Sequence, residues 1–114
     1  MLNSGDVVDV DLGIPAGTEA GFGRPAVVVT AQRVIEAGSS VVHVVPLTSR
    51  VRGHGSEIGL EADPLNGLDG RSAAQCQHIR AVAAARIGTR RGNVGAAALA
   101  QIREVLGLLL DTPS

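Results

Sequence analysis

Residues 25–31 read PAVVVTA, and this continuous β-branched run predicts a strand buried on both faces of a sheet. Upstream, DVVDVDL at residues 6–12 alternates apolar with mostly acidic side chains, which predicts a half-buried strand. Downstream, SVVHVVPLT at residues 40–48 predicts a third strand, with Pro46 marking its outer end or an edge position. Together the three runs predict the centre of one β-sheet.

Shorter elements are predicted around these strands. GIPAGTEAGFGR at residues 13–24 holds a proline and several glycines and therefore predicts a loop. EIGLE at residues 57–61 predicts a short strand, and SAAQCQHIRAV at residues 72–82 alternates like another. Between them, residues 62–71 form a turn-rich connection, and residues 89–93 an arginine-rich loop.

One clear helix is predicted over residues 95–110, with Gly95 as an acceptable N-cap. Its apolar residues recur at three- and four-residue spacing, namely Leu99, Ile102, Leu106 and Leu109. Because strands come first and the helix last, the order predicts the α+β class, as a strongly curved antiparallel sheet or small barrel closed by a C-terminal helix. A length of 114 residues predicts one domain, residues 1–114.

Composition limits how this chain can bind nucleic acid. Only Phe22 is aromatic, so base stacking on aromatic platforms is nearly excluded. All ten basic residues are arginine, whose guanidinium forks match phosphate oxygens, although a codon bias explains the same fact. The net charge of -1 means that nucleic-acid binding must use local patches. Residues 1–20 carry acidic side chains without a basic partner, whereas Arg90 and Arg91 sit together.

The compartment is predicted from cysteine usage and hydropathy. A single cysteine, Cys76, excludes an intrachain disulfide and fits a reducing compartment. The chain begins with MLNSGDVV, which is not a signal-peptide pattern, and its apolar stretches are far shorter than a membrane span. We therefore expect a soluble, cytoplasmic protein with no membrane partner.

Several site types are disfavoured by their motifs. The glycine-rich loop at residues 13–23 lacks the GK[ST] of a P-loop, and no dinucleotide fingerprint follows the first strand. His43, His54, His78 and Cys76 match no usual zinc-ligand spacing. We expect no metal and no cofactor.

The remaining polar candidates fall at predicted strand ends and in loops, where sites are usually built. They are Glu19, Arg24, Thr48, Ser49, Arg50, Gln77, His78 and Arg80. Arg24 is locally stiff because Pro25 follows it. Taken alone, Arg24 is equally explained as a solvated loop charge.

Four segments, in order, resemble the successive signatures of MazF/PemK (Kid-like) toxins. They are GDVVDVDLG at residues 5–13, GTEAGFGRPAVVV at 17–29, VVPLTSR at 44–50 and SAAQCQHIRAV at 72–82. The combination of GxE…RPAVVV with VPLTS is specific, and the resemblance covers nearly the whole chain. It implies an SH3-like barrel that forms a homodimer and acts as the toxin of a type II toxin-antitoxin system.

The resemblance also implies an activity and a partner. Such toxins cleave single-stranded RNA at short sequences without a metal, through attack of the 2′-hydroxyl on the adjacent phosphate. The products are a 2′,3′-cyclic phosphate and a 5′-hydroxyl. A cognate antitoxin is expected, whose disordered tail wraps the dimer and blocks the RNA groove.

Residue roles follow from matching positions. Arg24 matches the catalytic arginine and is assigned to stabilising phosphate charge, and Thr48 matches the strand-end threonine that donates to a phosphate oxygen. Glu19 matches the loop acid, which orients Arg24 or contacts RNA. RNA binding is assigned to Glu19 together with Thr18, Ser49, Arg50, Gln77, His78 and Arg80. Sequence preference is expected to lie in residues 13–23 and 49–55.

The chain departs from the family pattern at Gln77-His78, where an acidic residue followed by Gln is common. His78 either supplies a titrating group near neutral pH or fills a packing position. Two alternatives remain open. One is a catalytically weakened homologue that still binds an antitoxin. The other is a gyrase poison of the CcdB kind, which is disfavoured because the chain has no Trp.

Overall fold

The computed structural model describes residues 1–13 and 23–112. Its strands are β1 (Asp6–Asp11), β2 (Gly23–Val28), β3 (Val41–Thr48), β4 (Glu57–Leu60), β5 (Ser72–Gln75), β6 (Arg80–Ala83) and β7 (Ile87–Asn93). Its helices are α1 (Gln32–Glu36) and α2 (Gly95–Leu110), with 3-10 turns η1 (Cys76–His78) and η2 (Ala84–Arg86).

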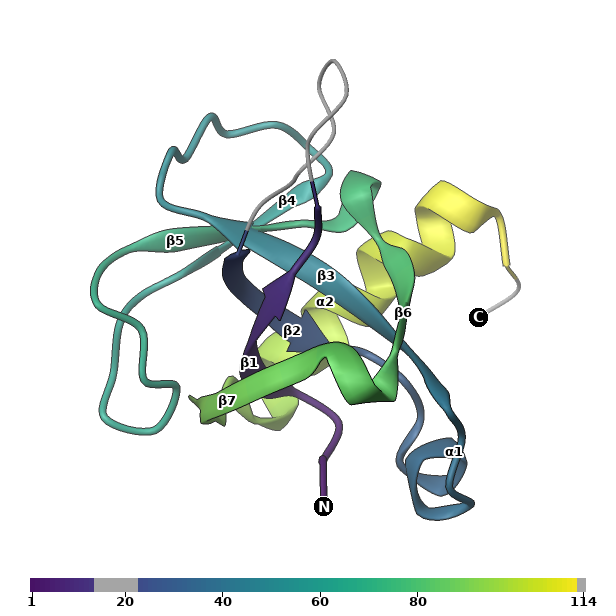
Figure 1. Ribbon diagram of the computed structural model, residues 1–114. Helices are drawn as coiled ribbons and strands as arrows, with labels where there is room; N and C mark the ends of the chain where they lie inside the picture. The colour runs from purple at the N-terminus through teal and green to yellow at the C-terminus, as the bar shows by residue number, and fades with distance from the viewer. Residues whose placement is uncertain (14–22, 113–114) are drawn as a thin grey trace.

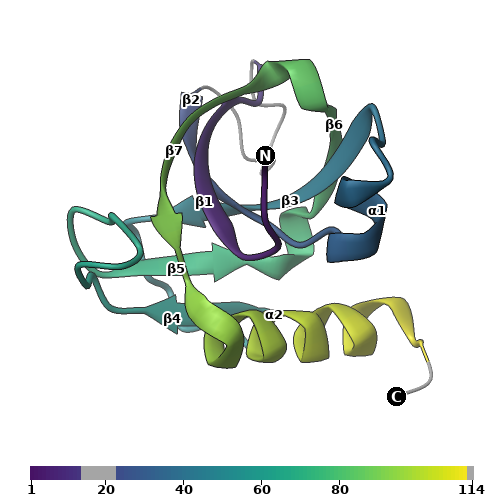
Figure 2. The ribbon, with the colours of Figure 1, turned by 90° about the horizontal axis from the view of Figure 1, so that it is seen from below.

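The strands form one antiparallel sheet in the order β4-β5-β3-β2-β1-β7, and β6 pairs with β3. The sheet is strongly curved (Figure 1). Strands β7, β1, β2, β3 and β6 curl around one core, and α2 lies across the outside of the curl (Figure 2). The predicted α+β class, with a curved antiparallel sheet and a C-terminal helix, is confirmed.

The β2 run separates two hydrophobic cores. Ala26 and Val28 face the inside of the curl, where they pack with residues of β1, β3 and β6. Val27 and Val29 face outward into a second core, which Ile102 of α2 completes. All five side chains are buried. Because both faces of β2 are covered, its sequence carries apolar residues at successive positions rather than at alternate ones, as predicted.

Helix α2 spans the predicted range, but its apolar stripe is shorter than predicted. Leu99, Ile102 and Leu106 are buried against the sheet, whereas Leu109 is 48% exposed. The C-terminal end of α2 extends past β4 and β5 (Figure 2). The N-cap is Val94 rather than the predicted Gly95, and its side chain makes no capping hydrogen bond. The Gly95 N–H donates to Asn93 Oδ1 at 2.8 Å.

Residues 72–82 form two strands rather than the predicted single one. Strand β5 pairs with residues 47–48 of β3, and β6 pairs with residues 41–44. The turn η1 lies between them and buries Cys76, where burial raises the pKa of the thiol to about 11. Pro46 was predicted to mark the outer end of β3 or an edge position, and that prediction is wrong. It lies between the two paired segments of β3, where its missing N–H breaks no ladder.

Residues 89–93 belong to the edge strand β7 rather than to the predicted loop. The cause is charge pairing with the acidic strand β1. Arg90 Nε lies 2.9 Å from Asp6 Oδ1, and Asp6 is fully buried. Arg91 Nε donates to Asp9 Oδ1 at 2.8 Å. Asp6 and Asp9 of β1 are therefore partners of Arg90 and Arg91 of β7.

No helix within residues 1–13 and 23–112 is long and apolar enough to cross a membrane.

Candidate functional site

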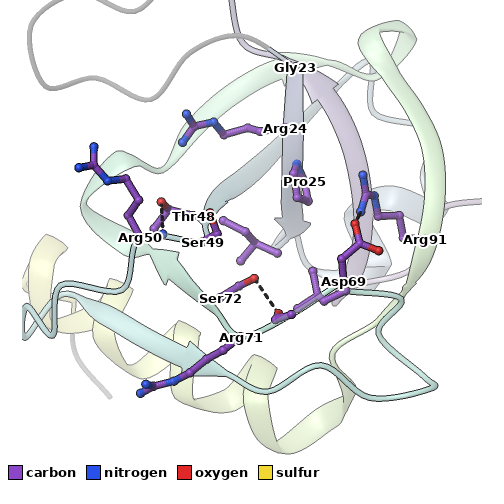
Figure 3. A pocket seen from close by; sticks show the side chains of 13 residues that line it. Gly23, Arg24, Pro25, Thr48, Ser49, Arg50, Asp69, Arg71, Ser72 and Arg91 are labelled. Atoms are coloured by element: carbon purple, nitrogen blue, oxygen red, sulfur yellow. Dashed lines mark hydrogen bonds and ion pairs between the residues drawn. The ribbon is translucent and has the colours of Figure 1, made fainter.

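A pocket of about 390 Å³ opens where β2 begins and β3 ends. Arg24 and Arg50 lie on one side of it, and Asp69 and Arg91 lie on the other (Figure 3). The residues that line it are Gly23, Arg24, Pro25, Leu47, Thr48, Ser49, Arg50, Leu68, Asp69, Gly70, Arg71, Ser72 and Arg91. The structure thus brings together Arg24, Thr48, Ser49 and Arg50, as their sequence-based assignment to one site requires.

Strand pairing brings Arg24 and Thr48 to the same pocket. In the antiparallel ladder of β2 and β3, Ala26 lies opposite Pro46. Arg24 and Thr48 each lie two residues from that pair, toward the pocket, and both line it. Thr48 also pairs with Ala73 of β5. Arg24 pairs with Val10 of β1. The two side chains therefore project from backbone that the sheet fixes.

The threonine hydroxyl has a defined orientation. The Arg50 backbone N–H donates to Thr48 Oγ1 at 3.1 Å, as the dashed line in Figure 3 marks. A hydroxyl has one hydrogen and two lone pairs, so this bond uses a lone pair and leaves the hydrogen to donate. Thr48 can therefore offer its hydrogen to an anion in the pocket.

The opposite wall consists of residues 68–72 and Arg91. Arg91 is anchored by Asp9, and its Nη1 lies 3.6 Å from Asp69 Oδ2. The Asp69 side chain is 97% exposed, whereas that of Arg91 is only 29% exposed. Arg71 extends away from Thr48 (Figure 3) and lies 3.4 Å from Glu61 at the surface. Arg91 is the cation that this wall presents to the pocket.

Side-chain hydrogen bonds within residues 61–68 hold this wall in place. Asn66 is 3% exposed, and its Oδ1 accepts from the backbone N–H groups of Asp63 and Leu68 at 3.1 and 3.0 Å. Its Nδ2 donates to the carbonyl of Glu61 at 2.9 Å. Such closed networks rigidify a segment when every member is satisfied. The loop is therefore a shaped wall rather than a loose connection.

Two glycines dock this loop on β7. A Cβ at Gly92 would overlap the carbonyl oxygen of Leu65, and a Cβ at Gly67 would overlap that of Arg91. Gly67 also has a φ of +66°, which side chains rarely adopt. The close approach lets the Asn93 N–H donate to the Leu65 carbonyl at 2.9 Å.

Three predicted RNA-binding residues do not line the pocket. Gln77 and His78 lie in η1, and Gln77 is exposed. Arg80 begins β6, and its Nη1 donates to the Leu12 carbonyl at 3.0 Å. Their assignment to RNA binding stays a prediction. Thr18 and Glu19 lie outside the described residues.

The pocket wall that carries Asp69, Ser72 and Arg91 was not predicted from the sequence. Residues 66–67 and 69–70 read Asn-Gly and Asp-Gly, which are turn signals and carry no mark of a site. Arg91 fell in a segment predicted to be a loop. Its pairing with Asp9 depends on the register between β1 and β7, which no local pattern shows.

The pocket is suited to an anionic ligand with polar groups. Four arginines and a single carboxylate line it. Arginine stays protonated in proteins, and its N–H fork binds phosphate in a bidentate way. Among residues 1–13 and 23–112, no group of three or more His, Cys, Asp or Glu side chains is placed to hold a metal ion.

Known proteins share this fold and sequence. Endoribonuclease MazF9 of Mycobacterium tuberculosis is 38% identical over 97% of this chain and 98% of its own length. Among solved structures, MazF from Deinococcus radiodurans superposes with a TM-score of 0.81 at 28% identity, covering 97% of each chain. The MazE-MazF complex (Form-II) from Deinococcus radiodurans contains a chain with a TM-score of 0.77 at 27% identity, covering 98% of this chain and 97% of that one.

The resemblance inferred from the four segments is confirmed at the level of the family. A family model described as PemK-like, MazF-like toxin of type II toxin-antitoxin system matches residues 3–110. This range includes every described residue of the pocket. The chain therefore belongs to the PemK-like, MazF-like toxins of type II toxin-antitoxin systems.

Proposed function

We propose that this chain is a toxin endoribonuclease that cleaves single-stranded RNA in the pocket between the start of β2 and the end of β3. The observation that carries the proposal is the pocket at the start of β2 and the end of β3, which Arg24 and Thr48 both line. Support comes from membership of the toxin family and from the 38% identity to a relative named Endoribonuclease MazF9.

The reaction is attack of an RNA 2′-hydroxyl on the adjacent phosphate, with departure of the 5′-oxygen. Negative charge builds on the non-bridging oxygens in the transition state, and preorganised donors lower its energy. The Arg24 guanidinium supplies fixed positive charge, and Thr48 donates its remaining hydrogen to a phosphate oxygen. Arg24 is not the base that takes the 2′ proton, because its guanidinium stays protonated.

Other residues are assigned to holding the RNA on either side of the cut. Arg50 and Ser49 are exposed at the pocket rim and suit phosphates that flank the scissile one. Gln77 and His78 lie in η1 outside the pocket lining, so we assign them to RNA binding rather than to proton transfer. Glu19, which lies outside the described residues, is assigned to orienting Arg24 or to contacting RNA.

A cognate antitoxin and a homodimer are also part of the proposal. A MazF relative from Deinococcus radiodurans was crystallised as a MazE-MazF complex, which supports an antitoxin partner. Leu108 and Leu110 at the end of α2 are 76% and 62% exposed, and exposed apolar groups of this kind mark protein contacts. The antitoxin would bring a disordered tail that folds on binding in the cytoplasm.

Metal-free RNA cleavage tests the proposal. Purified protein in EDTA is expected to cut a long single-stranded RNA at discrete sites, leaving 5′-hydroxyl and 2′,3′-cyclic phosphate ends. Ligation or labelling that distinguishes 5′-hydroxyl from 5′-phosphate ends reads the chemistry. Cleavage that requires a divalent ion, or 5′-phosphate products, would contradict the mechanism. Intact RNA from folded protein would favour a homologue that only binds an antitoxin, and gyrase binding would then be measured.

A further inference from the structure

We propose that Asp69 is a specificity-determining residue, whose carboxylate reads an amino-bearing base of the RNA beside the cut. The inference rests on the proposed endoribonuclease function and assigns a role to the pocket wall opposite Arg24. The base would lie against Leu68 and Asp69, while the scissile phosphate lies near Arg24 and Thr48.

The pocket is larger than a phosphate group needs. Its volume of about 390 Å³ falls in the range of small-molecule sites, roughly 300–1,000 Å³. Its two sides also differ in chemistry. Arg24, Thr48 and Arg50 offer charge and donors, whereas the far side combines a largely buried Leu68 with the Asp69 carboxylate. A phosphate fits the first side, and a base with an apolar face and a polar edge fits the second.

The ion pair with Arg91 does not explain a carboxylate at this position. Arg91 is already paired with Asp9 at 2.8 Å, so Asp69 is not needed to neutralise it. The Asp69 oxygen is 3.6 Å from Arg91 and its side chain is 97% exposed. Exposed ion pairs of this kind contribute little to stability. A carboxylate also repels phosphate, so its presence in an anion-binding pocket calls for a contact with the ligand that offsets the repulsion.

The backbone on both sides of Asp69 is fixed, which specific readout requires. On one side, the Leu68 N–H donates to the buried Asn66 side chain at 3.0 Å. On the other side, Ser72 Oγ donates to the Gly70 carbonyl at 3.2 Å, as Figure 3 shows. Arg91 flanks the carboxylate and directs its Nη1 toward Oδ2. The carboxylate is thus presented from a rigid wall into an open part of the pocket.

Hydrogen bonding decides which bases suit this wall. An ionised carboxylate only accepts hydrogen bonds, so Asp69 selects bases that present N–H donors on an accessible edge. Guanine offers two adjacent donors, N1–H and N2–H, which match two carboxylate oxygens, and cytosine and adenine offer an amino group. Uracil offers one N–H between two carbonyl oxygens, which the carboxylate repels. Among the described residues that line the pocket none is Phe, Tyr or Trp, so hydrogen bonds to the base edge are assigned the discrimination between bases.

The test is Asp69→Asn with Glu104→Gln as the matched control, since Glu104 is an exposed acid on α2. Both variants and the wild type cut a randomised single-stranded RNA, and sequencing of the cut ends gives the preference at each position. The amide replaces one acceptor with an N–H₂ donor, which can pair with a uracil carbonyl. We expect preference for an amino-bearing base over uracil to fall about 5- to 100-fold at one position beside the cut.

The outcomes separate this inference from the proposed function. Wild-type protein that cuts no RNA would overturn the proposed function and the base reading with it. Wild-type cutting with an unchanged preference in Asp69→Asn would overturn the base reading alone. Equal loss of cleavage at all sequences in folded Asp69→Asn would also overturn it, because a general role is not readout. Melting curves check folding, and Asp69→Ala, which removes all polar atoms, should lose the same preference.

Discussion

Replacing Arg24 with alanine is expected to lower the rate of RNA cleavage about 100- to 1,000-fold, the usual cost of removing one preorganised donor from a developing oxyanion. Arg24 and Thr48 both line the pocket in which the cyclising phosphate is proposed to gain charge. Arg24→Lys keeps the charge but loses the planar fork, so its rate should fall between those of the wild type and Arg24→Ala. Single-turnover cleavage of one defined RNA measures all three rates.

The matched control for Arg24→Ala is Arg33→Ala. Arg33 is an exposed arginine on α1 and does not line the pocket. The Arg33→Ala variant removes the same charge from the chain, so it reports the effect of net charge on RNA binding. We expect its cleavage rate to stay within about twofold of the wild type, in keeping with weak long-range effects of exposed charges. Equal losses in the two variants would show that Arg24 acts through overall charge rather than at the reacting phosphate.

Gly92→Ala is expected to lower the free energy of unfolding by about 3 kcal/mol, the upper part of the range for overpacking. The added Cβ would overlap the carbonyl of Leu65 and the backbone of Asn66, neither of which can rotate away. The loop must separate from β7, which breaks the bond from the Asn93 N–H to the Leu65 carbonyl. Denaturant unfolding measures the loss.

Gly59→Ala on β4 is the control for the same chemical change. A Cβ there meets no atom within 4 Å, so its unfolding free energy should change by less than about 1 kcal/mol. Gly92→Ala should also disturb RNA cleavage, because residues 68–72 of the pocket wall follow the displaced loop. A Gly92→Ala protein as stable as Gly59→Ala would show that the loop is not docked on β7.

Local patterns were enough to predict the central strands and the long helix. The continuous β-branched run of β2 reflects burial on both faces of the sheet, and the three- and four-residue apolar spacing of α2 reflects burial on one face of the helix. Arg24 and Thr48 were assigned to one site through flanking motifs, and both line the pocket between the start of β2 and the end of β3. Strand ends next to glycine-rich or polar loops are positions that a sequence marks clearly.

Features that depend on contacts between distant segments were not predicted. The break at η1 follows from β3 pairing first with β6 and then with β5, which alternation in residues 72–82 does not reveal. Strand β7 looked like a loop because its arginines are polar, and only their pairing with Asp6 and Asp9 makes it a strand edge. The pocket wall that carries Asp69 depends on the close packing of residues 65–66 against Gly92. A single glycine in the sequence does not predict such a contact.

A crystal structure of the protein bound to a non-cleavable analogue of its RNA substrate tests most directly whether the scissile phosphate lies between Arg24 and Thr48. A 2′-deoxy substitution at the cut nucleotide removes the attacking hydroxyl and leaves the phosphate in place. We predict that one phosphate lies within hydrogen-bonding distance of the Arg24 guanidinium and Thr48 Oγ1, with its neighbouring base against residues 68–72. A phosphate bound elsewhere, with the pocket open to solvent, would contradict the assignment of this pocket as the cleavage site.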